Sequence, residues 1–221
     1  MKIHEIKRSA FDSLRGRWFI PIIAGILASF FGAGMGGNYT FALVEYLGIA
    51  LGNPAITIAL AIVSILLSVA IIILGGSVAI GYAEFTRDLV DGDTPSLSTL
   101  FRHFDRLVTG ICTALLVALH VFIGMIFLFI PGIIAAYRYS MVFYVLADNP
   151  QYGAIEALRE SRKIMRGHKF KLFITDFTLI GWDLLAILTL GISNLWAVPY
   201  RQAVRAVFYR DICCPSVKYK K

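Results

Sequence analysis

Long apolar runs constrain this chain more than any other feature of its sequence. Residues 55–76, AITIALAIVSILLSVAIIILGG, carry no charged side chain, and residues 107–147 form an apolar stretch whose one charged member is Arg138. A transmembrane helix needs about twenty consecutive apolar residues, whereas the core of a water-soluble domain does not. Only 16% of the residues are charged, against roughly 25% in soluble domains. The sequence therefore predicts an all-α fold, a polytopic transmembrane helical bundle that forms one membrane domain over residues 1–221.

The positions of Lys and Arg predict how the chain is threaded, because basic residues beside membrane spans mark the cytoplasmic side. Residues 36–54 contain no Lys or Arg and are expected outside, whereas six basic residues lie between Arg159 and Lys171 and are expected inside. We expect about six spans with both termini cytoplasmic. These spans cover residues 18–35, 55–76, 107–130, 133–147, 171–190 and 195–209.

Pro131-Gly132 divides the apolar stretch 107–147 in one of two ways. A tight turn would separate two spans, whereas a kink would leave one long helix. Basic residues flank the stretch on both sides, which requires an even number of crossings between them. The charge pattern therefore favours two spans, of which the second is short and contains Arg138.

Three amphipathic segments are expected to form surface helices on the cytoplasmic side. The first, residues 1–17, has apolar residues at helical spacing, and the second follows the turn Asp91-Gly92-Asp93, with Thr94 as its cap and Pro95 as its first helical residue. The third begins near residue 151, with Asp148 or Asn149 as its cap and Gly167 as its stop. The apolar faces comprise Ile3, Ile6, Ala10, Phe11 and Leu14 in the first segment, Leu97, Leu100, Phe101 and Phe104 in the second, and Ala154, Ile155, Leu158 and Met165 in the third.

Basic side chains on the third segment are candidates for binding the membrane surface. Arg159, Lys163, Arg166 and Lys169 lie on its polar side or just beyond it. Juxtamembrane basic residues attract anionic headgroups. We therefore expect the lipid bilayer, through anionic headgroups, as a partner of this segment.

A faint internal repeat is visible in the basic segments. LRGRWF at 14–19 is similar to MRGHKF at 165–170, and each leads directly into an apolar run. This pattern predicts three units, each a surface helix followed by a helical hairpin, over residues 1–54, 84–147 and 148–211. A chance similarity is the alternative, because a basic helix before a membrane span is common.

The side chains do not form a catalytic, cofactor-binding or metal-binding pattern. Three of the four histidines, His4, His103 and His168, lie in basic surface segments, and His120 inside a span is expected to hydrogen-bond a neighbouring helix. Cys213 and Cys214 are adjacent and are interpreted as ordinary thiols, with soft-metal binding or acylation as alternatives. The net charge of +7 would suggest nucleic acid for a soluble protein, but here the basic residues flank apolar runs. We expect no enzymatic activity, no cofactor or metal and no nucleic-acid partner.

Charged residues within the last two spans are the strongest candidates for a functional site, because buried charges in a membrane are costly. Asp176 and Asp183 are seven residues apart, and Arg201 and Arg205 are four apart, so each pair shares one face of its helix. Counted from the turn at 191–194, Asp183 and Arg201 lie at nearly the same depth and are expected to pair. The pair would hold two helices in register, and the alternatives are a polar cavity for a substrate or a proton and snorkelling of the charged side chains to the membrane interface.

Three C-terminal stretches resemble a known family. EALRESRKIMRGHKFKLF, DFTLIGWDLLAILTLGI and LWAVPYRQAVRAVFYRD are similar to the C-terminal half of a bacterial integral membrane family catalogued as domain of unknown function 975. That family is related to the membrane domain found beside glycerophosphodiester phosphodiesterases. The resemblance implies a multi-pass protein of the bacterial cytoplasmic membrane and no assigned activity. It is strong over residues 138–211 and includes Ser161, Gly167, Gly181, Trp182, Pro199 and Tyr200.

These observations lead to two functional hypotheses. The first is a non-enzymatic scaffold, accessory protein or stress or immunity factor, which binds anionic headgroups and has a membrane-protein partner or forms a homo-oligomer. The second is a small transporter or channel with a polar cavity around Asp183, Arg201 and Arg138, since interrupted helices often line such cavities.

Overall fold

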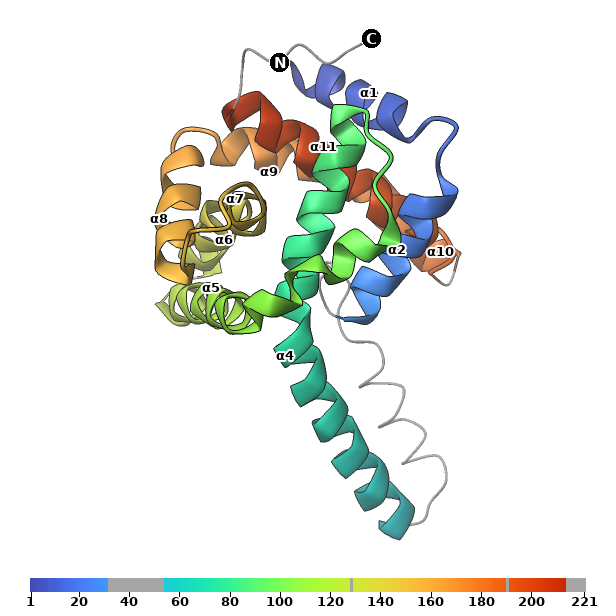
Figure 1. Ribbon diagram of the computed structural model, residues 1–221, viewed down its shortest axis with the longest axis vertical. Coiled ribbons are helices and arrows are strands. Elements are labelled where there is room, and N and C mark those ends of the chain that lie inside the picture. The colour runs from blue at the N-terminus through green and yellow to red at the C-terminus, as the bar shows by residue number, and fades with distance from the viewer. Residues whose placement is uncertain (32–53, 128, 190, 214–221) are drawn as a thin grey trace.

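The structure, a computed structural model, describes residues 1–31, 54–127, 129–189 and 191–213, and every regular element in these ranges is a helix (Figure 1). The predicted all-α fold is thus confirmed for this part of the chain. The elements are α1 (Ile3–Leu14), α2 (Phe19–Phe30), α4 (Pro54–Asp91), the 3₁₀ helix η1 (Leu97–Arg106), α5 (Leu107–Phe127), α6 (Phe129–Arg138), α7 (Val142–Asp148), α8 (Ala154–Ile164), α9 (Lys169–Phe177), α10 (Ile180–Leu188) and α11 (Asn194–Cys213).

Helix α4 is much longer than the predicted span 55–76. At about 1.5 Å per residue its 38 residues extend over roughly 57 Å, about twice the hydrocarbon thickness of a bilayer. The helix continues to Asp91 because Phe85 and Leu89 are buried. It ends there because the next residue, Gly92, has a positive φ. One half of α4 extends beyond the other described helices, while the other half lies among them (Figure 1).

Helices α4 and α5 touch through their backbones where they cross. A Cβ atom added to Gly76 would lie 2.4 Å from the carbonyl carbon of Gly110, and one added to Gly110 would lie 2.8 Å from the carbonyl carbon of Gly76. Real Cβ atoms do not approach backbone this closely, so both positions require glycine. Close backbone approach through small residues is typical of helix pairs in membranes.

Helices α5 and α6 form an antiparallel hairpin, so the chain turns rather than kinks near Pro131-Gly132. A Cβ atom on Gly124 would lie 3.0 Å from the Cα atom of Gly132, and α5 ends at Phe127 before α6 begins at Phe129. Pro131 is in the first turn of α6, where a missing N–H costs little. The predicted separation into two segments is therefore correct, although Pro131 lies within α6 and the second segment is itself interrupted between α6 and α7.

Two helical segments of the described residues are long and apolar enough to cross a membrane. Leu97–Ile126 has a mean hydropathy of 2.2 and Ile130–Asp148 one of 1.4. These segments, which contain α5 and α6–α7, are seen almost end-on in Figure 1, whereas α4 runs along the long axis of the molecule. They indicate an association with a membrane.

The other predicted spans differ from the observed helices. Helix α2 is an apolar helix of 12 residues, and the remainder of the predicted span 18–35 lies outside the described residues apart from Trp18 and Phe31. The predicted span 171–190 is not one helix, because α9 ends at Phe177 and α10 begins at Ile180. The predicted span 195–209 corresponds to α11, which is longer and includes Pro199 in its second turn.

The amphipathic segments are helical, but their apolar faces pack mainly on the protein. In α1, Ile6, Ala10 and Leu14 are buried, and the helix packs on α11 and α4. In α8, Ala157 and Leu158 are buried, and the helix packs on α5 and α7, while Ile155 is 66% exposed. The helix periodicity identifies an apolar face, but only the packing shows that protein covers most of it.

The starts of the second and third amphipathic helices were predicted wrongly. Helix η1 has Ser96 at its N-cap rather than Thr94. Asp148 ends α7 instead of capping α8, whose N-cap is Gly153, and the Gly153 N–H donates to Glu156 Oε2 at 2.9 Å. Asp and Asn are strong caps in isolation, but a local pattern does not show where a preceding helix ends.

Gly16 and Gly167 occupy the same place in the two similar stretches LRGRWF and MRGHKF. Their φ angles are +79° and +86°, a region that favours glycine, and each follows an amphipathic helix and precedes the next helix. The two stretches thus form similar turns, and the threefold repeat over the whole chain stays a prediction.

Candidate functional site

The middle of α11 is enclosed by other helices and contains a charged residue. Residues 203–209 are all buried, and Arg205 is among them. Its Nη2 atom lies 3.0 Å from Oδ2 of Asp176 on α9, and the two side chains are only 10% and 16% exposed. A buried charge needs such a partner, because desolvation of an isolated ion costs several kcal/mol. Removing one partner of a buried ion pair lowers the stability of the fold by about 3–5 kcal/mol.

The structure brings together two of the five charged residues predicted for the membrane site, Asp176 and Arg205. Arg201 lies one turn earlier on α11 and is half-buried. The side chain of Asp183 lies outside the described residues, and so does its predicted pair with Arg201. Arg138, at the end of α6, lies close enough to Lys169 for charge repulsion.

A cluster of four basic side chains lies where α6 ends, α8 ends and α9 begins. The pKa of Lys169 is lowered by burial and then by the positive charges of Arg138, Arg162 and Arg166. No described ion pair involves these four residues, which we call the basic cluster. Sequence analysis identified Arg166 and Lys169 but missed Arg162 and assigned Arg138 elsewhere, because the cluster combines residues from separate helices.

The other two predicted surface residues are not in this cluster. Lys163 donates to Glu160 Oε1 at 3.4 Å within α8, and Arg159 is exposed. Helical spacing placed all four on one segment, but the segment turns at Gly167 before Lys169. Lys169 is thereby moved next to Arg138.

His103 is buried, although the sequence placed it in a basic surface segment. Its Nε2 atom lies 2.7 Å from Oε2 of Glu84, and Arg102 donates to Oε1 of the same carboxylate at 2.8 Å. Glu84 is on α4, so these contacts attach η1 to α4. A local sequence pattern did not reveal the contact because Glu84 lies in the preceding helix.

A second polar junction connects α4, α7 and α11. Arg87 pairs with Asp148, Tyr209 donates to Asp148 Oδ2 at 2.7 Å, and Arg210 pairs with Asp91. These partners lie 61 or 119 residues apart in the sequence, so sequence analysis did not identify them. The junction holds three helices together at one end of the protein.

Asp211 connects the end of α11 to the N-terminal region and to α9. Its carboxylate accepts from the Met1 ammonium at 2.9 Å and from Lys171 Nζ at 2.8 Å. Burial alone would raise the pKa of Asp211, but these two positive partners outweigh it and lower the pKa below its ordinary value.

The sequence also drew attention to His120 and to the adjacent Cys213 and Cys214. His120 is exposed, and its Nδ1 lies 2.7 Å from the carbonyl oxygen of Leu116 in the same helix, so its predicted hydrogen bond to a neighbouring helix is wrong. Cys213 is half-buried, and Cys214 lies outside the described residues. Among the described residues, no group of three or more potential ligands could hold a metal ion.

Over the residues that the structure describes, the fold and the charged residues define a helical protein with two membrane-length segments and polar contacts between its helices. Residues 115–214 match the sequence model of a family described as "Protein of unknown function (DUF975)". This match confirms the resemblance found in the C-terminal stretches and extends it to α5. Neither the curated proteins nor the solved structures gave a match.

Proposed function

We propose that this chain is a non-enzymatic, multi-pass protein of the bacterial cytoplasmic membrane whose basic cluster binds anionic lipid headgroups. In this proposal it acts as a scaffold, accessory protein or stress or immunity factor. The observation that carries the proposal is the basic cluster itself. Four positive charges gather there and the pKa of Lys169 is lowered, so an anion would relieve their mutual repulsion.

The exposed apolar surface supports the membrane assignment. Large apolar side chains on α5 and α10 are exposed, among them Phe122 at 62% and Leu188 at 79%. Many exposed large apolar side chains require cover, which lipid supplies for the membrane-length segments. The hairpin of α5 and α6–α7 provides two spans, and the proposed total of about six rests on the apolar runs and the positions of Lys and Arg.

The cluster lies on the side of the chain that the positive-inside rule assigns to the cytoplasm. The inner leaflet is anionic, and each nearby Lys or Arg contributes about 1 kcal/mol to the attraction. Because α8 buries its apolar face on α5 and α7, its charged face is available for headgroups.

Neutralising two members of the cluster is expected to weaken the association with anionic lipid about thirtyfold, at about 1 kcal/mol for each charge. The variant is Arg162→Gln/Arg166→Gln in the full chain. The measurement is native mass spectrometry of the purified protein titrated with phosphatidylglycerol and, separately, phosphatidylcholine.

The matched control is Arg159→Gln/Lys163→Gln, which removes the same charge from the same helix outside the cluster. It should change the phosphatidylglycerol affinity much less. Equal losses in the two double variants would mean that only the overall charge matters and would refute a defined headgroup site.

The second candidate function is a small transporter or channel with a polar cavity around Asp183, Arg201 and Arg138. The interruption between α9 and α10 favours it, because broken helices line the binding sites of many transporters. The position of Arg138 beside Lys169 weighs against its part in such a cavity. Loss of flux in proteoliposomes of Asp183→Asn, with normal protein accumulation, would favour transport.

A further inference from the structure

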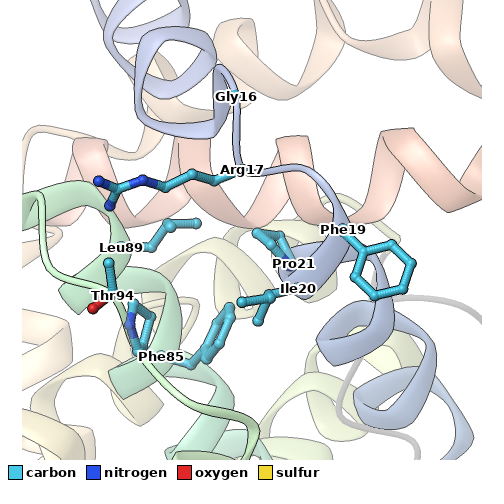
Figure 2. A pocket seen from close by; sticks show the side chains of 9 residues that line it. Gly16, Arg17, Phe19, Ile20, Pro21, Phe85, Leu89 and Thr94 are labelled. Carbon is cyan, nitrogen blue, oxygen red and sulfur yellow. The ribbon is translucent and has the colours of Figure 1, made fainter.

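A pocket of about 320 Å³ lies between the first turn of α2, the C-terminal half of α4 and the segment that follows α4 (Figure 2). Its inner wall is formed by Phe85 and Leu89, which are buried. Phe19, Ile20 and Pro21 of α2 form another wall. The volume is at the lower end of the range of roughly 300–1,000 Å³ for small-molecule sites.

One side of this pocket is polar. Arg17 extends across it above Thr94, while the ring of Phe19 lies on the opposite side (Figure 2). Nη1 of Arg17 donates to the backbone oxygen of Asp93 at 3.3 Å, and no ion pair in the described part of the chain involves Arg17. A guanidinium has five N–H donors, so several remain for an anion.

The first turn of α2 adds to the attraction for an anion. Trp18 occupies the N-cap, and its side chain makes no capping hydrogen bond. Within α2 the backbone N–H groups of Phe19 and Ile20 have no intrahelical partner and carry the positive end of the helix dipole, whereas Pro21 has no N–H to donate. Because Phe19, Ile20 and Pro21 line the pocket, this helix end lies beside Arg17.

The pocket therefore combines an anion-binding side with an apolar interior. Neither a free phosphate nor a neutral hydrocarbon would use both. The first apolar helix, α2, begins directly at the pocket, and Trp18 immediately precedes it, a residue type that is enriched at membrane interfaces. A phospholipid carries a charged phosphate next to its acyl chains, which matches the polar side and the apolar interior of the pocket.

We propose that this pocket binds one anionic phospholipid of the inner leaflet. Its phosphate lies beside Arg17 and the first turn of α2, and the upper part of an acyl chain lies against Phe19, Ile20 and Leu89. The site is separate from the basic cluster on α6, α8 and α9, and its place at the inner interface rests on the proposed membrane topology.

The test uses Trp18, the residue between the pocket-lining Arg17 and Phe19, as a reporter of lipid bound beside it. The chain has three tryptophans, so Trp182→Phe/Trp196→Phe leaves Trp18 alone. This full-length protein, in non-ionic detergent, is titrated with phosphatidylglycerol carrying brominated acyl chains, which quench nearby indoles on contact. Brominated phosphatidylcholine is one parallel arm, and inorganic phosphate added in competition with brominated phosphatidylglycerol is the other.

We expect saturable quenching by brominated phosphatidylglycerol at concentrations about tenfold lower than for brominated phosphatidylcholine. A tenfold difference in affinity corresponds to the contribution of about one charge-assisted hydrogen bond. Arg17→Gln should remove this preference and Arg17→Lys should keep most of it. Arg15→Gln, two residues away and outside the pocket, should change it less than twofold. Melting curves without lipid show whether each variant is folded.

Equal quenching by the two lipids, or equal losses in Arg17→Gln and Arg15→Gln, would overturn the proposal. Complete reversal of quenching by inorganic phosphate would also overturn it, because the site would then take a free anion. The Arg162→Gln/Arg166→Gln variant is expected to leave Trp18 quenching unchanged. The experiments can therefore refute lipid binding at the basic cluster and lipid binding in this pocket separately.

Discussion

Gly76→Val is expected to destabilise the protein by about 3 kcal/mol or more, because the new side chain meets backbone rather than a movable side chain. A Cβ atom at this position would lie 2.4 Å from both the carbonyl carbon and the carbonyl oxygen of Gly110. The two helices would have to separate, which removes the contact between α4 and the membrane-length helix α5. Typical total stabilities are only about 5–15 kcal/mol. The measurement is the melting temperature in detergent together with the amount of protein in membranes.

Gly181→Ala is the matched control for this substitution. Gly181 is also in a helix, but nothing lies within 4 Å of an added Cβ atom. Gly181 is the second residue of α10, where an added methyl group meets open space, so this variant should be about as stable as the parent. A Gly76→Val protein that melts with the parent would mean that α4 and α5 do not touch through their backbones.

Arg205→Leu is expected to cost about 3–5 kcal/mol, because it leaves the carboxylate of Asp176 enclosed without its positive partner. Asp176→Leu/Arg205→Leu removes both charges and should be more stable than the single variant. The measurement is the free energy of unfolding in mixed micelles for both single variants and the double variant, from which the coupling between the two positions follows.

An exposed ion pair provides the contrast. Lys163 and Glu160 are 76% and 32% exposed, so Glu160→Gln should change the free energy of unfolding by less than about 0.5 kcal/mol. Additive costs for Asp176→Leu and Arg205→Leu would show that the two residues do not depend on each other. The proposed role of the pair in joining α9 to α11 would then be wrong.

The candidate site was partly visible in the sequence. Asp176 and Arg205 stood out because a charged side chain in an apolar run needs a partner. Their pairing was not predicted. The depths of the charged residues were counted from the turn at 191–194 on the assumption of one straight helix over 171–190, whereas the chain is interrupted between α9 and α10. The pocket beside Arg17 was not anticipated either, because its walls come from α2, α4 and the segment after α4.

The basic cluster illustrates a related limit. Arg166 and Lys169 were recognised from their neighbours in the sequence, but Arg138 was placed in a different site. Repulsion between Arg138 and Lys169 depends on how α6 and α9 pack, which helical spacing does not specify. His103 shows the same effect, since its partner Glu84 belongs to α4.

The sequence by itself determined that this protein is helical, that it has membrane-length apolar segments, and that its amphipathic helices have one apolar face. These properties depend on neighbours within a few helical turns, which composition and periodicity report directly. Only the tertiary structure decided where α4 ends, what covers the apolar faces and which charges meet. Those outcomes depend on contacts between helices distant in the sequence, where close backbone approach and desolvation of charges set the free energy.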